Sequence, residues 1–567
     1  MMRRPAVRRG SALTLGAPAE RADMLRLTCA VVSSITLAAM VRPAPGHSPS
    51  APRLKSSTMV GNDSCRPCHR AIYDNYSRTA MARTSGPAFP PLEGSVRHSP
   101  SGVLYRIYRE GQTARLSYER TAGASLRGMQ DLTYYVGSNT RGRTFLFEIE
   151  GFFYQAPINY YAEKDLWDMS PGYGALTAME LNHPVDSTCL FCHASRAQPV
   201  RKGTVNGFAG PPFLQNGVGC ERCHGAGSDH VNRSGSMVDP AALTGARRDS
   251  LCMQCHLEGE ARIARAGRSE DDYKPGELLS DSLTIFVRED DARDRRAAVS
   301  HVESLALSAC SRKSAGALAC TSCHDPHVQP RAAERADYYR SKCIACHAPQ
   351  AAGHYPRGRD CTACHMPRLD SADIAHTVVT DHRIVRVPQA DPPRSAEVGR
   401  LVPFGDGPAG TRELGLAYGE IALRGNTFAA REARRLLEDA RQGGADDADV
   451  LTRLASLYQA QGDMAAAERY YKQALARDPD RGVVAANLGV FYASRGMLRE
   501  ALDLWRAAFE KNPQLSELGV NLARGLCEAG DAAGARAALQ RVLTHNPDFA
   551  IARQSLADVV QHGCARK

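Results

Sequence analysis

The sequence predicts a mainly α-helical protein with two unlike parts. The first part has little regular structure apart from a small β insert, and the second is an α-solenoid of stacked helix pairs. Three observations predict this division. All Cys-x-x-Cys-His motifs lie within residues 60–388, alternating apolar runs occur within residues 92–165, and a 34-residue period appears after residue 411. A chain of 567 residues is also too long for one hydrophobic core.

The N-terminus has the pattern of an export signal. Arginines are frequent in residues 3–9, and an uncharged apolar stretch follows at residues 27–41, before Pro43 and Pro45. This stretch is shorter than the roughly twenty residues that a spanning helix needs. Residues 1–45 are therefore predicted to be a signal peptide or an N-terminal anchor, and residues 46–59 a linker. We expect an exported protein that meets a membrane only through this segment.

Residues 92–165 are predicted to form a β insert between the first two motifs. Residues 103–108 and 114–118 alternate around Gly111, and residues 144–150 and 152–158 alternate around Gly151. Paired runs rich in aromatic and β-branched residues, separated by glycine, are typical of hairpins.

Residues 389–410 form a linker rich in proline and glycine, and residues 411–567 contain the repeats. The residues that recur in phase include Gly462, Gly496 and Gly530, and Asp478, Asn512 and Asn546, each of the last three before a proline. The period resembles the tetratricopeptide repeat (TPR), in which each unit is a pair of antiparallel helices. The resemblance implies a concave face that binds a protein partner.

Seven Cys-x-x-Cys-His motifs use fourteen of the eighteen cysteines. In chain order, motifs 1 to 7 are Cys65/Cys68/His69, Cys189/Cys192/His193, Cys220/Cys223/His224, Cys252/Cys255/His256, Cys320/Cys323/His324, Cys343/Cys346/His347 and Cys361/Cys364/His365. Two cysteines three apart on a helical turn project from one side and can form thioethers along one porphyrin edge. The adjacent histidine then reaches the iron. Zinc also binds Cys-x-x-Cys pairs, but it does not explain a histidine directly after all seven. The motifs predict seven covalently bound haem c groups.

Each iron also needs a sixth ligand if the protein only transfers electrons, because a filled axial position leaves no place for substrate. The chain has eighteen histidines, and seven are in the motifs. Eight other histidines within residues 60–388 are candidates for the seven places, and one of them is His98. The other seven are the predicted further iron ligands: His183, His230, His301, His327, His354, His376 and His382. Their surroundings favour His98 and His327 least, and Met81 is an alternative ligand near motif 1.

Four stretches around the motifs carry a family resemblance. They are residues 182–186 before motif 2, residues 217–225 around motif 3 with His230, residues 320–327, and residues 361–367. These stretches resemble the multihaem cytochromes related to the tetrahaem electron carrier that serves hydroxylamine oxidoreductase. The resemblance implies periplasmic electron transfer and two-histidine ligation, with His183, His230, His301 and His354 as the best matches for distal ligands. Seven motifs exceed the four of the carrier and fall short of the eight of the oxidoreductase.

The predicted function is electron transfer between redox partner proteins, with the TPR repeats docking a protein. The alternative is an oxidoreductase that acts on a small nitrogen or sulfur compound at one five-coordinate haem. No Cys-x-x-Cys-Lys motif is present, which removes the pattern typical of pentahaem nitrite reductases. No catalytic residue is predicted. The net charge of +10 is dispersed, and haem propionates would offset it, so no nucleic-acid partner is expected.

The remaining cysteines give weaker signals. Cys29 belongs to the predicted signal. Cys310 is either an apolar filler or a thiol that faces a haem. Cys527 is predicted to be a small buried apolar residue within a helix. Its pairing with Cys564 stays open, because a disulfide depends on geometry.

Overall fold

The computed structural model describes residues 57–289, 297–352, 360–387, 399–405, 407 and 409–564. The predicted export signal, parts of both predicted linkers and His354 lie outside the described residues. About 43% of the chain is helical and 18% is in sheets. Within the described part of the chain, no helix has the length and apolar character needed to span a membrane.

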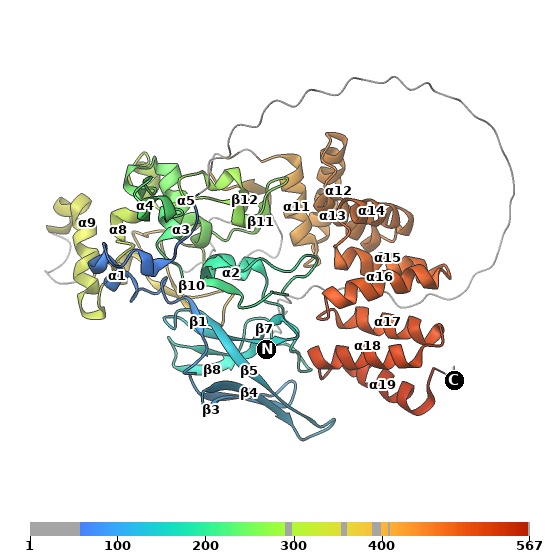
Figure 1. The fold of residues 1–567 in the computed structure, drawn as a ribbon. Helices are drawn as coiled ribbons and strands as arrows, with labels where there is room; N and C mark the ends of the chain where they lie inside the picture. The colour runs from blue at the N-terminus through green and yellow to red at the C-terminus, as the bar shows by residue number, and fades with distance from the viewer. Residues whose placement is uncertain are drawn as a thin grey trace, which may run out of the picture.

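An antiparallel sheet forms the lower part of the N-terminal half (Figure 1). It has eight strands, in the order β2-β3-β4-β5-β6-β7-β8, and β1 pairs with β5 outside this path. The sheet curls almost closed, so that β2 lies beside β8. The strands are β1 (Ser85–Pro87), β2 (Gly94–His98), β3 (Val103–Glu110), β4 (Thr113–Arg120), β5 (Leu126–Val136), β6 (Arg143–Ile149), β7 (Phe152–Tyr161) and β8 (Leu166–Met169). The prediction of little regular structure is not confirmed here.

Alternation of apolar residues explains the sheet. Val103, Tyr105 and Ile107 on β3 all point into a core that β4 and β7 also line, whereas the residues between them are more exposed. Both predicted hairpins are present, and each turns at its predicted glycine: Gly111 has φ 60° and Gly151 has φ 78°. These values lie in the left-handed region that glycine enters without steric cost. The sheet continues beyond the predicted insert at both ends.

The seven motifs lie on short helices and turns around the upper edge of this sheet (Figure 1). The helices of this region are α1 (Arg70–Tyr76), α2 (Ser187–His193), α3 (Glu221–His224), α4 (Ser228–Val231), α5 (Gly245–His256), α6 (His301–Ala306), α7 (Ala309–Lys313), α8 (Cys320–Cys323), α9 (Arg335–Ala352) and α10 (Cys361–His365), and motif residues lie on α2, α3, α5, α8, α9 and α10. The small strands among them are β9 (Ala194–Ala197), β10 (Phe213–Asn216), β11 (Ala261–Ala264), β12 (Leu283–Arg288), β13 (Arg368–Asp370), β14 (Val378–Thr380) and β15 (Leu401–Pro403).

The last three motifs have almost no apolar core of their own. Among the described residues between 297 and 387, the buried apolar side chains are Ala298, Ala319 and Val379. The sheet and the repeats, in contrast, each bury a large continuous cluster. Hydrophobic burial of protein side chains therefore contributes little to the fold around motifs 5 to 7.

The C-terminal part is a column of antiparallel helix pairs (Figure 1). Its helices are α11 (Thr411–Ala422), α12 (Thr427–Gln442), α13 (Ala448–Ala460), α14 (Met464–Arg477), α15 (Gly482–Ser494), α16 (Leu498–Lys511), α17 (Ser516–Glu528), α18 (Ala532–His545) and α19 (Ala550–His562). The in-phase glycines Gly462, Gly496 and Gly530 have φ of 83°, 75° and 81°, respectively, in the turn that joins the two helices of each repeat. Glycine recurs at this position because the turn requires a positive φ.

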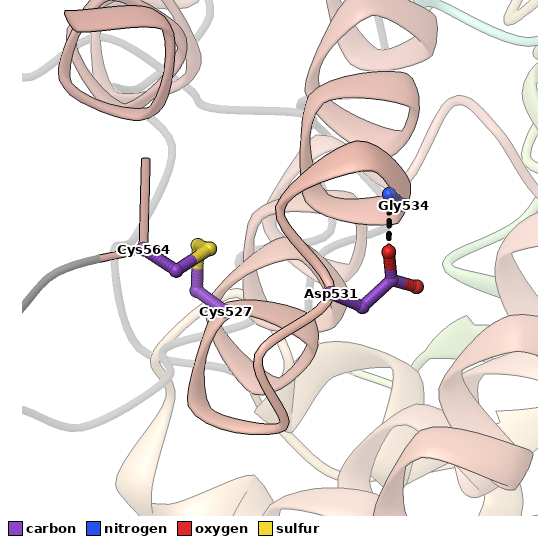
Figure 2. Close-up of a disulfide and its surroundings, with 4 residues drawn as sticks. All are labelled: Cys527, Asp531, Gly534 and Cys564. Carbon is purple, nitrogen blue, oxygen red and sulfur yellow. Dashed lines mark hydrogen bonds between the residues drawn. A yellow bond between two sulfur atoms is a disulfide. The ribbon is translucent and has the colours of Figure 1, made fainter. Parts of the chain in front are cut away.

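A disulfide fastens the end of the last helix to the preceding repeat. Cys527 of α17 is bonded to Cys564, which follows α19, and Asp531 caps α18 nearby by accepting a hydrogen bond of 2.8 Å from the Gly534 N–H (Figure 2). The prediction that Cys527 is only an apolar residue is wrong. The two cysteines lie 37 positions apart, and only the packing of α19 on α17 and α18 brings them together.

We expect loss of this disulfide to loosen α19 before the rest of the column. Closing a loop of this length restricts the unfolded chain by up to about 4 kcal/mol. Cys564→Ser should lower the thermal unfolding temperature of the repeats, and reductant should lower it equally in the parent protein. The matched control is Cys310→Ser, which removes a thiol outside any disulfide. An unfolding temperature in Cys564→Ser equal to that of Cys310→Ser would contradict this role.

The repeats are bound to the sheet through the loops that follow their second helices. Asp548, after α18, accepts two hydrogen bonds of 2.7 and 2.8 Å from the Arg120 guanidinium of β4 and one of 2.9 Å from the Met179 N–H. Burial opposes ionisation of this carboxyl, but the Arg120 hydrogen bonds hold its pKa below its ordinary value. Asn182 donates to the Gln514 carbonyl oxygen at 3.0 Å. These contacts join the solenoid to the segment that leads to motif 2.

A buried histidine lies in the same interface. His545 is 0% exposed, and its Nδ1 lies 2.8 Å from the Tyr154 hydroxyl of β7. Its ring also packs edge-on against Phe152, and Arg541 donates to Glu150 at 3.0 Å. Burial lowers the pKa of His545 to about 4, although Glu150 opposes this shift, so the ring is neutral when the two parts are joined.

At its other end the solenoid is joined to the three-stranded sheet β11-β12-β15. The Tyr418 hydroxyl of α11 accepts a hydrogen bond of 3.0 Å from the Leu401 N–H, and Arg412 donates to the Ala264 carbonyl oxygen at 3.0 Å. Phe286 of β12 belongs to the same apolar cluster as α11. The repeats are thus attached at both ends to the part that carries the motifs.

Asp548→Ala should weaken this attachment strongly, because it leaves the Arg120 guanidinium buried without its partner. Breaking a buried ion pair in this way costs about 3–5 kcal/mol. The free energy of unfolding from a denaturant titration checks the value. Asp503→Ala is the matched control, since the Asp503 side chain is 71% exposed and its ion pair with Arg506 is long at 4.0 Å. We expect that control to change stability by less than about 1 kcal/mol. Similar losses of unfolding free energy in Asp548→Ala and Asp503→Ala would contradict a stabilising role for this interface.

Candidate functional site

Each motif is built on a single helical turn. In motifs 1, 3 and 5 the histidine N–H donates to the carbonyl oxygen of the first cysteine, at 3.0 Å in each case. Acidic residues fix two of the other turns: Asp186 caps α2 by accepting from the Thr188 and Cys189 N–H groups, and Asp360 caps α10 by accepting from the Thr362 N–H. The turn places both cysteines and the histidine within reach of one bound group.

Motifs far apart in the sequence are neighbours in space. In four pairs, a cysteine of one motif raises the pKa of a cysteine in another motif, so the two side chains are neighbours. The pairs are Cys65 with Cys220 (motifs 1 and 3), Cys192 with Cys255 (motifs 2 and 4), Cys252 with Cys320 (motifs 4 and 5) and Cys343 with Cys361 (motifs 6 and 7).

Longer-range contacts complete the series. Cys223 of motif 3 interacts electrostatically with both cysteines of motif 4, and Cys323 of motif 5 does so with Cys343 of motif 6. Cys310, which the sequence left unassigned, lies beside Cys323 and Cys343. The motifs therefore follow one another in the order 1-3-4-5-6-7, and motif 2 joins at motif 4.

The predicted attachment cysteines are not equally covered by the protein. Most are partly buried, but Cys68, Cys346 and Cys364, the second cysteines of motifs 1, 6 and 7, are exposed to solvent, and so is Cys189. The structure therefore does not enclose a cofactor position at Cys68, Cys346 or Cys364. The reason is their place in the order of motifs: motifs 1 and 7 are its ends and motif 6 is next to an end, so fewer neighbours cover them. A thioether is a covalent bond and does not depend on burial, so haem attachment at these three positions stays a prediction.

Four motif histidines face a second histidine. The ring centres are 6.3 Å apart for His69 and His230, 6.0 Å for His224 and His327, 5.3 Å for His256 and His301, and 6.3 Å for His324 and His382. An iron held between two imidazoles by bonds of about 2 Å separates the ring centres by about 6 Å. Three of the four separations fit such an iron directly, and the rings of His256 and His301 would have to part by about 1 Å.

Several of these rings are oriented by oxygen acceptors. Nδ1 of His224 lies 3.0 Å from the Val238 carbonyl oxygen, Nδ1 of His365 lies 2.8 Å from that of Val385, and Nδ1 of His382 lies 2.9 Å from that of Thr380. A carbonyl oxygen can only accept, so Nδ1 carries the proton and Nε2 keeps its lone pair for a metal. The residues present fit a haem iron.

The other predicted ligands are placed differently. His183 stacks on Tyr173 with ring centres 4.0 Å apart, and its Nε2 lies 3.4 Å from Glu180. Nε2 of His376 lies 2.7 Å from Asp168. His98 is buried, with both ring nitrogens close to oxygen atoms. His354 lies outside the described residues. The structure thus brings His327 to a motif, although the sequence favoured it least, and does not bring His183 or His376 to one.

Motif 2 differs from motifs 1, 3, 4 and 5. Nδ1 of His193 lies 2.6 Å from the Thr84 hydroxyl, and burial lowers the pKa of His193, so its ring is neutral. Among the described residues, no ring contact joins His193 to a second histidine. The same holds for His347 of motif 6.

Two protein-family models match segments of the chain, one within the repeats and one within the part that carries the motifs. A family model described as tetratricopeptide repeat matches residues 448–481, and one described as cytochrome c554 and c-prime matches residues 172–225. The second match includes motifs 2 and 3. The C-terminal part is a TPR domain of the kind that mediates protein–protein interaction, and the segment around motifs 2 and 3 is similar to a c-type cytochrome. The relation to the carrier of hydroxylamine oxidoreductase stays a prediction.

Solved structures similar to the chain are TPR proteins and cover about a quarter of it. A structure of MamA labelled AMB-1 is 23% identical over 27% of this chain and 81% of its own, with a TM-score of 0.24. YrrB, described as a TPR protein with an unusual peptide-binding site, is 20% identical over 26% of this chain and 72% of its own, with a TM-score of 0.22. No curated protein matches the chain.

Proposed function

We propose that the chain is an exported seven-haem c-type cytochrome that transfers electrons between redox partner proteins. The observation that carries the proposal is the unbroken order of motifs in space. Each of the seven motifs has a cysteine that interacts with a cysteine of a neighbouring motif, although the sequence separates motifs 1 and 3 by more than a hundred residues. When bound, haem iron supplies a one-electron carrier at each motif.

The paired histidines support electron transfer rather than binding of a substrate. His230, His327, His301 and His382 each stand opposite a motif histidine, so both axial positions would be filled by side chains of this chain. The Val238 and Thr380 carbonyl oxygens orient two of these rings. We assign His230, His327, His301 and His382 as the distal ligands of motifs 1, 3, 4 and 5.

The thin apolar core around motifs 5 to 7 supports the cofactor as well. Three small or medium apolar side chains are buried there, which is too little to order so many residues. Covalently attached macrocycles would supply the missing apolar surface.

The disulfide between Cys527 and Cys564 supports export. Disulfides form and persist in oxidising compartments such as the periplasm and are rare in the cytosol. Attachment of haem to seven Cys-x-x-Cys-His motifs fits the same compartment, and so does the predicted signal in residues 1–45. We propose a periplasmic location.

A second function is favoured by one observation. Among the described residues neither His193 nor His347 has a second histidine ring beside it, so an iron with an open axial position would lie at motif 6 or motif 2. His347 is exposed and His193 is partly buried, which favours motif 2. An oxidoreductase acting on a small nitrogen or sulfur compound would then use this motif, and Thr84 would orient its proximal ligand.

Protein produced with the haem-attachment machinery should gain the mass of seven haems over the signal-cleaved polypeptide. Its oxidised form should be mainly six-coordinate and low-spin, because paired histidines give a strong axial field. Intact-mass spectrometry and electron paramagnetic resonance make the two measurements. A bare polypeptide mass would end the proposal. A high-spin signal that a small ligand abolishes would favour the oxidoreductase.

His327→Leu tests the ligand assignment. Removal of the distal imidazole at motif 3 should convert about one seventh of the iron to a high-spin form. His98→Leu is the matched control, since His98 is a buried histidine whose ring nitrogens already contact Ser101 and Gly174. An entirely unchanged spin state in His327→Leu would show that His327 ligates no iron.

A further inference from the structure

Two guanidinium groups flank motif 4 without a carboxylate partner. Arg222 lies over the Phe191 ring with its Cζ 4.1 Å from the ring centre, and its Nη2 donates to the Phe191 carbonyl oxygen at 3.0 Å. It also interacts electrostatically with Cys255. Arg141, from the turn between β5 and β6, donates to the Ala298 carbonyl oxygen at 2.8 Å, and its Nη2 lies 3.3 Å from Nε2 of His301. Among the described residues, neither guanidinium lies within ion-pair distance of a carboxylate.

Two other arginines near motif 4 are paired with carboxylates. Arg262 donates to Glu270 at 3.1 Å and also to the Gln254 carbonyl oxygen inside the motif. Arg248 lies 3.9 Å from Asp249, whose carboxylate contributes to raising the pKa of Cys252. Arg247 of α5 donates to the Gly276 carbonyl oxygen at 2.6 Å, but its side chain is exposed to solvent, which screens its charge. The partly buried positive charge that remains around motif 4 therefore comes from Arg141 and Arg222.

More distant acidic groups interact with the two arginines electrostatically, without forming ion pairs with them. Asp271 interacts electrostatically with Arg222, and Glu163 and Asp373 with Arg141, while Arg368 opposes them. Both guanidiniums are partly buried. A charge acts more strongly on its neighbours in such a low-dielectric surrounding than in water.

Motif 4 is also the branch point of the array. It contacts motif 2 through Cys255, motif 3 through Cys223 and motif 5 through Cys252. Arg222 lies between the two cysteines of motif 3 and interacts electrostatically with Cys223 of that motif and with Cys255 of motif 4. Arg141 interacts with His256 of motif 4 and with His382, which faces motif 5. Positive charge thus lies on both sides of the one motif that electrons from three neighbours can reach.

We infer that Arg141 and Arg222 are positioning residues that make the haem of motif 4 the most easily reduced in the array, so that electrons collect at the branch point. The inference rests on the proposed function. A nearby fixed positive charge stabilises the reduced iron, which carries one positive charge less, and thereby raises its reduction potential. The same guanidiniums can also bind haem carboxylates, which holds the macrocycle in place.

The test is a potentiometric titration of the full chain followed by optical spectroscopy, on Arg222→Gln and Arg141→Gln. Each substitution should make the most easily reduced component about tenfold harder to reduce, which is a fall of about 59 mV for a one-electron couple. Arg222→Lys should retain most of the parent potential, because it keeps the charge while losing the planar contact with Phe191. The matched control is Arg97→Gln, an exposed arginine of β2, which should leave the titration unchanged.

The outcomes separate the inference from the proposed function. Unchanged potentials in both glutamine variants would overturn the inference, as would an equal fall in Arg97→Gln. A fall in Arg222→Lys as large as in Arg222→Gln would show that packing, and not charge, is responsible. If intact mass shows that the parent protein carries no haem, the proposed function itself fails. If one glutamine variant loses haem while the parent protein keeps it, the substituted arginine holds the macrocycle in place. The reduction potentials of Arg222→Lys and of the other glutamine variant then test the effect of charge.

Discussion

The segments that carry motifs 5 to 7 cannot be ordered by the burial of their own side chains, and much of the remaining structure follows from this constraint. Ordering a residue costs about 1–2 kcal/mol of backbone entropy, and the buried apolar side chains between residues 297 and 387 cannot offset it. Order must come from contacts between motifs and from a scaffold beside them. In the function that we propose, the array of neighbouring motifs with haem attached would be both the electron path and the internal core of this part of the protein.

The scaffold consists of the sheet and the repeats, and the sheet contacts particular motifs. The sheet brings Thr84, at the start of β1, to His193 of motif 2, and the turn between β5 and β6 brings Arg141 to His301 near motif 4. Glu221 shows how closely the motifs themselves are joined: its carboxylate, within motif 3, accepts hydrogen bonds of 2.8 Å from the Val60 and Gly61 N–H groups ahead of motif 1. A carboxylate that is buried without a cation is stabilised by such backbone donors. Loss of this local order would change the distance between motifs 1 and 3.

The sequence predicted the features that have a short period or a fixed spacing. The repeats have a 34-residue period and the motifs have a five-residue pattern, so each could be found without knowing the fold. The ligands opposite the motifs have no such spacing. His327 is close to His324 in the chain but stands opposite His224, because motif 3 and the turn after motif 5 meet only in the folded protein. His183 was favoured by its surroundings in the sequence, yet its ring is taken up by Tyr173. The pairing of Cys527 with Cys564 stayed open in the sequence for the same reason, since α19 has to fold back on α17 before Cys564 reaches Cys527.

The repeat period also determines how the solenoid is attached to the cytochrome part. Asp480, Gln514 and Asp548 occupy the same position in three successive repeats, 34 residues apart. Asp480 binds Lys202 at 2.8 Å, the Gln514 carbonyl oxygen accepts from Asn182, and Asp548 binds Arg120. Stacked repeats present equivalent loops in a row, so one edge of the column makes a continuous line of polar contacts along residues 179–203 and the sheet. These loops are occupied by the chain itself. A redox partner that the TPR domain recruits must bind other surfaces of the repeats, and it would be held at a fixed position relative to the motifs because the domain that holds it is bonded at both ends to the part that carries them.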